Sequence, residues 1–290
     1  MSCLYYNGKS VMLSGTKWVS YNEGPVLPAF TMRFKFAETS YDPTNDSWGS
    51  GTTWTRVSSD PNIWDYKNEN TSWGGAFSYS NLGSRFSTYD SIYVLGSNTS
   101  QVVSFEEAFH EIPNLVSVDY MHTESAGTMK KMFYMCNGLE HVGWMDTSNV
   151  TDMSYAFAAT FSIGADFPLL DTSNVTDISH MFHASTISVL PPFDTSSVVD
   201  MSYFCAVDSY YMPLIRSIPA FDTSHVTNIS HAFEGCEIVD SGALALYQSA
   251  STQSTPPSIT TNCFSDCGIQ SQTGLAELQQ IPSSWGGLAP

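Results

Sequence analysis

The sequence predicts an α/β solenoid, a fold in which short parallel strands and short helices alternate from repeat to repeat. A segment Asp-Thr-Ser-x-Val occurs four times, and each copy runs into Met-Ser or Ile-Ser. The copies begin at Asp146, Asp171, Asp194 and Asp222, 23 to 28 residues apart. A period in the twenties is typical of repeats that bury their apolar faces only against their neighbours. We therefore expect six or seven stacked repeats, called rungs below, over residues 96–267.

The helices are predicted from an apolar residue that is followed four residues later by a phenylalanine. This spacing places both side chains on one face of a helix of two turns. The pairs are Phe105 and Phe109, Met129 and Phe133, Met153 and Phe157, Ile178 and Phe182, and Ile229 and Phe233, while Met201 is followed by Cys205. A degenerate seventh helix is expected to end at Phe264. Thr151, Thr176 and Thr227 precede three of these helices, where a hydroxyl can accept a free amide hydrogen.

The strands are predicted from short apolar stretches between the helices. Their apolar pairs are Leu115 and Val118, Leu139 and Val142, Ile187 and Leu190, and Ile215 and Ile218. We expect these stretches to pair in parallel from rung to rung. The aspartate of each Asp-Thr-Ser segment is interpreted as a turn residue whose carboxylate accepts nearby backbone N–H groups.

Residues 1–95 are expected to form a small β-rich domain that caps the first rung or anchors the protein. Residues 30–36 alternate apolar and polar side chains, which predicts a half-buried strand. Residues 53–57 and 62–66 are further strand candidates. The tryptophans of this part are either the core of the domain or a sugar-stacking platform, and the core is favoured. They are Trp18, Trp48, Trp54, Trp64 and Trp73.

Residues 268–290 are expected to cap the last rung, because a stack of repeats needs an atypical end with a polar outer face. Helices are predicted over residues 241–250 and 274–280, and the second stops at Ile281-Pro282.

The cysteines follow the phase of the repeat. Cys136, Cys236 and Cys267 each lie three residues after a repeat phenylalanine, and Cys205 replaces one. Such positions predict buried free thiols, which pack as small apolar side chains, rather than disulfides. Cys263 and Cys267 have no second Cys or His pair at the spacing of a zinc site, so neither a metal nor a cofactor is expected.

The repeat segment carries a resemblance to a known family. Copies such as MDTSNVTDMSYAF and FDTSHVTNISHAF, the latter followed by Glu234-Gly235-Cys236, resemble the BspA-like leucine-rich repeats of bacterial and mycoplasma surface proteins. This resemblance covers about residues 99–267. The segments FTMRFKF, NIWDY, SGALALYQSASTQSTPPS and QIPSSWGG also resemble repeat proteins of gut Bacteroidales and their phages. The resemblance implies a leucine-rich-repeat fold, surface exposure and binding to host or cell-envelope components.

The charge of the chain is unevenly distributed. Residues 1–98 contain eight acidic and seven basic residues, whereas residues 99–290 contain twenty acidic and only three basic ones. The repeats should therefore repel nucleic acid and anionic membranes, and no segment has the apolar length of a membrane span. Cationic surfaces, neutral glycans or divalent cations remain as partners, unless the carboxylates serve only to keep the repeats soluble. The N-terminus, MSCLYYNGKSVMLSG, lacks the basic and apolar segments of a signal peptide, which predicts folding in the cytoplasm without export.

No pattern in the sequence indicates a catalytic site, so we expect a protein that is not an enzyme. His180 and His183 stand one turn apart, but no third ligand of matching spacing accompanies them. A different pattern predicts a binding surface: the position two residues past each expected helix start carries Glu107, Lys131, Tyr155, His180, Tyr203 and His231. We expect Tyr155, His180, Tyr203 and His231 to form a ladder that binds glycan by stacking or packs against a neighbouring subunit. Alternatively, these rings only shield the turn below them.

Two functions follow as expectations. The first is a structural protein of a bacteriophage virion, in a tail, fibre or head appendage, assembled in the host cytoplasm. Its expected partners are other virion proteins, further copies of itself and a glycan or protein of the host surface, with no nucleic acid and no membrane insertion. The alternative is an adhesin or binding module of the bacterial cell surface.

Overall fold

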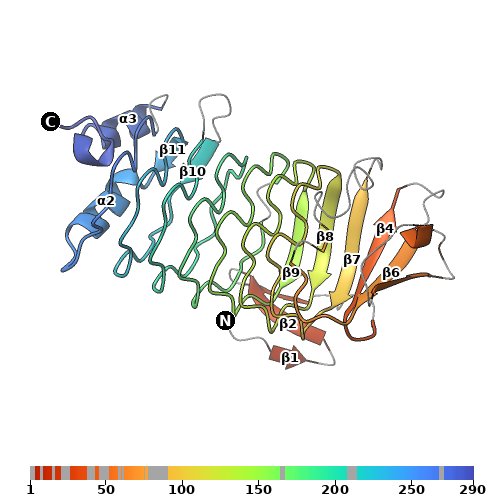
Figure 1. Ribbon diagram of the computed structural model, residues 1–290. Helices are drawn as coiled ribbons and strands as arrows, with labels where there is room; N and C mark the ends of the chain where they lie inside the picture. Colours follow the sequence, from red (N-terminus) through yellow and green to blue (C-terminus); the bar gives the residue numbers. More distant parts are fainter. Residues whose placement is uncertain are drawn as a thin grey trace.

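The computed structural model describes residues 27–37, 52–57, 62–74, 91–163, 167–207, 214–267 and 271–290, with the shorter segments 4–6, 9–14, 17–20, 43–45, 60 and 76–77. Strands β1 (Leu4–Tyr6), β2 (Lys9–Ser14) and β3 (Lys17–Ser20) form an antiparallel sheet, and η1 (Pro43–Asn45) is a short 3-10 helix. The main sheet has six strands in the order β5-β6-β4-β7-β8-β9. Its strands are β4 (Thr31–Phe36), β5 (Thr52–Arg56), β6 (Ile63–Asn68), β7 (Ile92–Asn98), β8 (Leu115–Met121) and β9 (His141–Met145). Figure 1 shows this sheet at one end of the molecule.

The C-terminal end is built from a second pair of strands and from helices. Strands β10 (Leu214–Ser217) and β11 (Glu237–Ser241) pair in parallel. Helices α2 (Ala243–Ser251) and α3 (Gln272–Leu278) follow, with the 3-10 helix η3 (Ser283–Trp285) near the C-terminus (Figure 1). Glu277 of α3 accepts hydrogen bonds from the backbone N–H groups of Gly242 and Leu244, so it caps the N-terminus of α2. Both helices predicted at this end are confirmed.

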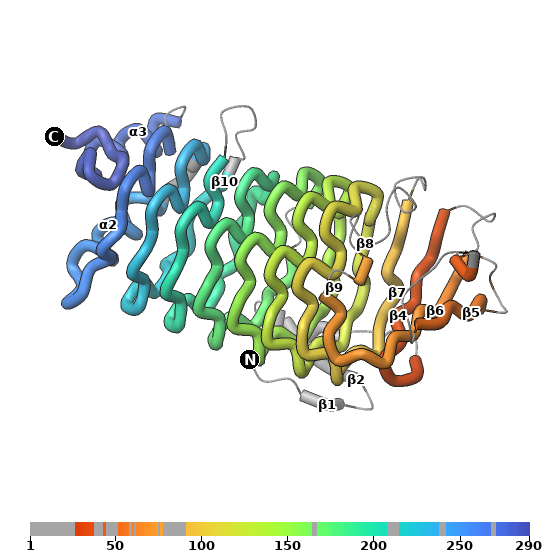
Figure 2. Tube along the Cα trace, in the orientation of Figure 1, coloured from red at the N-terminus to blue at the C-terminus, as the bar shows by residue number. Residues whose placement is uncertain are grey.

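The predicted α/β solenoid is wrong, because the structure is mostly β. Within the described residues, the α-helices are α2, which lies between the bridge positions Asn228 and Ile259, and α3, which follows the last bridge position. The segments expected to be helices, such as residues 105–111, are runs of turns instead. The repeats nevertheless stack, as the tube in Figure 2 shows. A ladder of single parallel β-bridges joins eight successive positions. These positions are Ser72, Ser104, Thr128, Asp152, Asp177, Asp200, Asn228 and Ile259.

The hydrogen bonds of the turn segments explain why no helix forms there. The N–H groups of Phe105, Glu107 and Phe109 donate to carbonyls of the next rung, at 2.9 to 3.1 Å. A helix would need the same groups for bonds to its own carbonyls four residues back. In addition, the third residue of each segment and often the seventh have φ between 53° and 59°, a left-handed conformation that a right-handed helix excludes. The spacing of four between apolar residues therefore reflects two successive turns.

The core of the stack is a column of phenylalanine rings. Phe109, Phe133, Phe157 and Phe182 stack face to face, with ring centroids 5.3 to 5.8 Å apart. The column continues through Phe204, Phe233 and Phe264 to Trp285. Phe204 fills the column in the rung where the sequence predicted Cys205 as the exception. Each phenylalanine of the column is at most 2% exposed, so the column is the interior of the repeats.

The predicted strands between the turns are only partly present. Leu115 and Val118 lie in β8, and Val142 lies in β9, which pairs in parallel with β8. Ile215 lies in β10, but Ile187 and Leu190 belong to no strand. All of these side chains are buried, so the apolar pattern predicted burial better than it predicted strand pairing.

The Asp-Thr-Ser segment has two structural roles. As predicted, its aspartate accepts from a backbone N–H: Asp146 Oδ1 accepts from the N–H of Ser148 at 3.0 Å and from its hydroxyl at 2.6 Å. The buried threonine joins one rung to the next, because its hydroxyl donates to a backbone carbonyl of the following rung at 2.6 to 2.8 Å. These threonines are Thr99, Thr123, Thr147, Thr172 and Thr195. By contrast, Thr151, Thr176 and Thr227 donate to carbonyls of the preceding rung and do not accept an N–H as the sequence predicted.

Replacing the buried Thr147 with valine should lower the free energy of unfolding by about 1–2 kcal/mol, because it leaves the partly buried carbonyl of Asp171 without its donor at nearly unchanged volume. Urea denaturation followed by circular dichroism measures the change. Thr151→Val is the control, since that hydroxyl also bonds between rungs but is exposed. Equal losses in the two variants would show that burial of the threonine is unimportant.

Strands β4, β5 and β6 belong to the same sheet as the first rungs. β4, β5 and β6 cover the three predicted strand segments, and β4 pairs with β7, which in turn pairs in parallel with β8. Trp54, Trp64 and Trp73 are buried, as expected of a core. The side chains of Trp18 and Trp48 lie outside the described residues. The sheet is continuous across residue 95, and the division of the chain into domains at that point stays a prediction.

The thiols of the repeats are buried and free. Cys136, Cys205, Cys236, Cys263 and Cys267 lie in the interior, as predicted for the positions in phase with the repeat. Cys136 Sγ donates to the carbonyl of Phe109 at 2.9 Å. Burial raises the pKa of the Cys136 thiol to about 12, so it stays protonated and unreactive in the folded protein.

Candidate functional site

The predicted ladder lies on the turn segments, at the third residue of successive rungs. The residues at this position are Glu107, Lys131, Tyr155, His180, Tyr203 and His231, and all have φ between 53° and 58°. In this conformation the backbone N–H of each residue donates to the next rung, for example Tyr155 to the carbonyl of Ser179 at 3.0 Å. The inter-rung bonds thus hold equivalent residues of successive rungs side by side. As a result, side chains that are 23 to 28 residues apart in the sequence lie next to each other.

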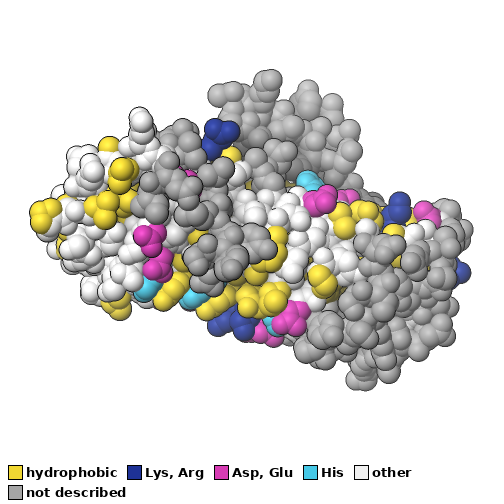
Figure 3. Space-filling view, turned by 90° about the horizontal axis from the view of Figure 1, so that it is seen from above, with side chains coloured by type: hydrophobic (Ala, Val, Ile, Leu, Met, Phe, Trp, Pro, Cys, Tyr) yellow, Lys and Arg dark blue, Asp and Glu magenta, His cyan; other side chains and the backbone are white. Residues whose placement is uncertain are grey.

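Four of these side chains form a continuous stack of rings, called the ring ladder below. Tyr155 and His180 have ring centroids 4.1 Å apart, His180 and Tyr203 4.6 Å, and Tyr203 and His231 4.4 Å. The ring planes are within 5° to 12° of parallel. All four residues are half-buried. In the view of Figure 3, histidines lie along one edge of the molecule among side chains of the hydrophobic class, which includes tyrosine.

The stacking determines which parts of the rings in the ring ladder a ligand can contact. Each face of His180 and Tyr203 is covered by a neighbouring ring at less than 5 Å, which leaves no space for a ligand ring between them. The expected binding of glycan by stacking on these faces is therefore disfavoured by the geometry. What remains for a partner is the exposed part of the ring edges, which carry alternating phenol and imidazole groups that donate and accept hydrogen bonds, although the Nδ1 atom of His180 is buried. Such a row suits contact with a polar surface.

Charged groups flank the ring ladder at both ends. Before it, Lys131 forms an ion pair with Glu107 at 3.2 Å, one rung apart. At the other end, His231 Nδ1 lies 2.7 Å from Glu234 Oε2. Burial raises the pKa of Tyr155, although the nearby Lys131 ammonium opposes this effect. The tyrosine therefore stays neutral at physiological pH and is available as a hydroxyl donor.

His180 is the most perturbed ring of the ladder. Burial, with a further contribution from His183, lowers the pKa of its imidazole to about 4, against a smaller opposing effect of Asp200. His183 is edge-on to it, with ring centroids 5.4 Å apart. His180 is thus neutral near pH 7, and the stack contains no charged ring at that position.

Lowering the pH from 7.5 to 5 should destabilise the protein through His180. Its pKa is about 4 in the folded state and about 6.5 in an unfolded chain, so the unfolded state binds more protons between these values. Stability is therefore lost as the pH falls through this window, by about 1 kcal/mol at pH 5 after allowing for solvent screening of a half-exposed ring. Urea denaturation across the pH range measures it.

The matched variant is His180→Tyr, which keeps a ring in the stack and removes the titrating group. Its unfolding free energy should depend less on pH than that of the wild type. His225→Asn is the control, because His225 is an exposed histidine outside the ring ladder. If His180→Tyr leaves the pH dependence unchanged, the imidazole is not the group responsible.

The described residues do not assemble a metal site: no group of three or more His, Cys, Asp or Glu side chains among them could hold an ion. His180 and His183 lie next to each other with their rings edge to face. Among the described residues, no helix has the length and apolar character needed to cross a bilayer.

Sequence reasoning missed further rings on this face. His110 and Tyr134, three residues past the ladder position, stack at 5.1 Å, and Tyr134 lies edge-on to Tyr155 at 6.1 Å. Their separation of 24 residues equals that of Phe109 and Phe133, so aligning the repeats would have found them. It also missed Tyr120 and Trp144, which stack at 4.9 Å between neighbouring strands.

Comparison with known proteins gives one family. The family described as "Mycoplasma protein of unknown function, DUF285" matches residues 103–210 and 185–253. The two overlapping matches span just over half of the chain and include the whole ring ladder. No curated protein and no solved structure matches the chain significantly.

Proposed function

The chain belongs to the DUF285 family, and from that premise we propose that it acts by binding, as a structural protein on the surface of a bacteriophage particle. The observation that carries the binding role is the ring ladder, a row of four stacked rings whose edges remain accessible over successive rungs. A surface role is supported by the resemblance of the repeats to BspA-like repeats of bacterial surface proteins. The phage setting is supported by the resemblance to repeat proteins of Bacteroidales phages.

The ring ladder is suited to contact with another polypeptide. Tyrosine is enriched at protein interfaces because its ring buries apolar area while its hydroxyl finds a hydrogen-bond partner. The two inner rings, His180 and Tyr203, are held by neighbouring rings on both faces, so little side-chain entropy is lost when a partner binds. We therefore assign the ladder to contacts with a second copy of the chain, a neighbouring virion protein or a protein of the host surface.

The distribution of charge supports an outward placement of the repeats. Residues 99–290 hold twenty acidic and three basic residues, and residues 1–98 are nearly neutral. A nearly neutral segment is easier to bury in an assembly than a strongly acidic one, whose mutual repulsion favours exposure to solvent. The N-terminal part is thus the proposed anchor, and the repeats are displayed.

Immunogold labelling of particles released by lysis tests the placement. Antibodies against residues 99–290 should label intact particles, while antibodies against residues 1–98 should label only disrupted ones. Labelling confined to the envelope of the producing cell would reject the virion role and favour the alternative, a cell-surface adhesin.

A pair of variants tests the role of the ring ladder. Tyr155→Phe combined with Tyr203→Phe keeps both rings and removes two edge hydroxyls. We expect its incorporation into particles, or the attachment of those particles to host cells, to fall several-fold. Tyr247→Phe is the control, since that ring packs against Trp285 at the C-terminal end. If neither incorporation nor attachment changes, the ladder edges are not the contact.

A further inference from the structure

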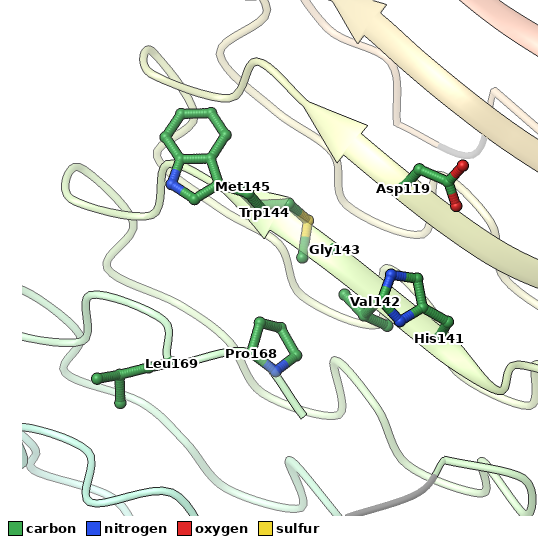
Figure 4. Close-up of a pocket in the computed structure, with 8 residues that line it drawn as sticks. All are labelled: Asp119, His141, Val142, Gly143, Trp144, Met145, Pro168 and Leu169. Atoms are coloured by element: carbon green, nitrogen blue, oxygen red, sulfur yellow. The ribbon is translucent and has the colours of Figure 1, made fainter. Parts of the chain in front are cut away.

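We propose that a slot beside β9 binds one neutral saccharide ring, stacked on the indole of Trp144. The slot has a volume of about 220 Å³ and is lined by Trp144, Gly143, His141, Asp119, Pro168 and Leu169, with Val142 and Met145 beneath. Figure 4 shows Trp144 at one end of it, Asp119 and His141 at the other, and Pro168 and Leu169 on the opposite side. Nothing in the family description assigns a ligand to this place.

The slot exists because the sheet stops at β9. Strands β7, β8 and β9 pair in parallel, and β9 is the last strand in the order of the sheet. In the following rung, Pro168 and Leu169 belong to no strand. Proline has no amide hydrogen to donate to a neighbouring strand. A space therefore opens between two rungs that are elsewhere closed by hydrogen bonds.

Trp144 provides a rigid stacking surface with one face covered. Its indole stacks on Tyr120 of the preceding rung, with ring centroids 4.9 Å apart and planes 20° from parallel. His122 lies edge-on to both rings, at 4.9 and 6.2 Å. The indole also lines the slot, together with Pro168 and Leu169 of the next rung. The half-buried indole therefore differs from the rings of the ladder, whose faces are occupied by one another.

Polar groups line the end of the slot opposite the indole. Asp119 is exposed, and its Oδ1 accepts a hydrogen bond from Ser117 Oγ at 2.9 Å, which holds the carboxylate in place. His141, opposite Ser117 in the parallel pair, is exposed at the same end of the slot. A carboxylate accepts from sugar hydroxyls and an imidazole both donates and accepts. An apolar wall with a few converging polar groups is the usual composition of a small-molecule site.

Size and charge select the class of ligand. The volume is below the range of about 300–1,000 Å³ typical of clefts for drug-sized molecules, so the slot holds a single ring. Asp119 within the slot and the exposed Glu140 beside it disfavour anionic sugars such as uronic or sialic acids. A neutral hexose or N-acetylhexosamine fits both conditions.

This inference names a ligand for the attachment role proposed above, but it rests on different residues, so each can fail alone. The test uses methyl glycosides of glucose, galactose, mannose and N-acetylglucosamine with the full chain, by saturation-transfer NMR and titration calorimetry. At least one should bind with a dissociation constant on the order of 1 mM. Trp144→Ala should weaken that binding at least tenfold, Trp144→Phe less, and Asp119→Asn should also weaken it.

The controls separate the slot from the ring ladder and from misfolding. Tyr203→Phe should leave saccharide binding unchanged, and circular dichroism should show that the Trp144 variants remain folded. If Trp144→Ala does not fold, Trp144→Phe and Asp119→Asn decide the question. Failure of all four glycosides to bind, or binding that is unchanged in the slot variants, would overturn the inference.

Discussion

Replacing Phe157 with alanine is expected to lower the free energy of unfolding by about 3–5 kcal/mol, because it removes a fully buried ring from the middle of the phenylalanine column. Phe157 contacts Phe133 and Phe182 in the column, with ring centroids 5.3 and 5.8 Å apart, and Phe167 edge-on at 4.8 Å. The neighbouring rungs are held by inter-rung hydrogen bonds and cannot collapse into the cavity. Urea denaturation monitored by circular dichroism measures the loss.

Phe161→Ala is the matched control in the same rung. That ring is 38% exposed, so its removal should lower the unfolding free energy by much less than the removal of the fully buried Phe157 ring. Stability in a stack of repeats depends on contacts between neighbouring rungs, so the Phe157 variant should also unfold less cooperatively. A loss no larger than that of Phe161→Ala would show that the column is not the main source of stability.

The sequence predicted the register of this column but not the fold around it. The phenylalanine spacing predicts that Phe157, Phe182 and Phe233 lie in one column, and the structure places all three there. The same spacing was read as a helix, because buried residues four apart occur both on a helix and in two successive turns. What distinguishes these two structures is the left-handed φ at residues such as Lys131 and Tyr155. Lysine and tyrosine in a sequence do not indicate a left-handed conformation, whereas glycine would.

The ring ladder shows a similar division between what was predictable and what was not. The common position of Tyr155, His180, Tyr203 and His231 in the repeat could be read from the sequence, and the structure brings the four rings together. Their separation of 4.1 to 4.6 Å depends on the inter-rung backbone bonds, which no local pattern reveals. That separation changes the chemistry, because it leaves ring edges rather than ring faces for a partner. The sequence alone favoured neither contact through the ring edges nor contact through the ring faces.

The slot at Trp144 was not predicted, because it depends on where the sheet ends. The apolar pair Leu139 and Val142 predicted a strand here, but the loss of strand structure at Pro168 is a property of the following rung. In the sequence, Gly143 indicates the position of the slot more clearly than Trp144 does. A Cβ at this position would lie 1.7 Å from the carbonyl oxygen of Asp119. Only glycine therefore allows β9 to approach β8 so closely.

Replacing Gly143 with alanine should lower the free energy of unfolding by about 3 kcal/mol or more, because the clash is with backbone that cannot rotate away. β9 would have to move from β8, which disturbs the pairs Val118–Val142 and Tyr120–Trp144 on both sides of the glycine. The stack of Tyr120 on Trp144 should open as a consequence. Urea denaturation measures the loss of stability, and the near-ultraviolet circular dichroism of the two rings should weaken under native conditions.

Gly127→Ala provides the control, since Gly127 also lies between two rungs and donates its N–H to the carbonyl of Val103. A Cβ there would lie 3.8 Å from that carbonyl oxygen, an ordinary contact, so the unfolding free energy should change by less than about 0.5 kcal/mol. If both variants were equally stable, β9 could move without cost and the slot would not be a rigid feature. A large loss confined to Gly143→Ala means that the backbone holding Trp144 is fixed before any ligand arrives, which is the condition for a site this small to bind at all.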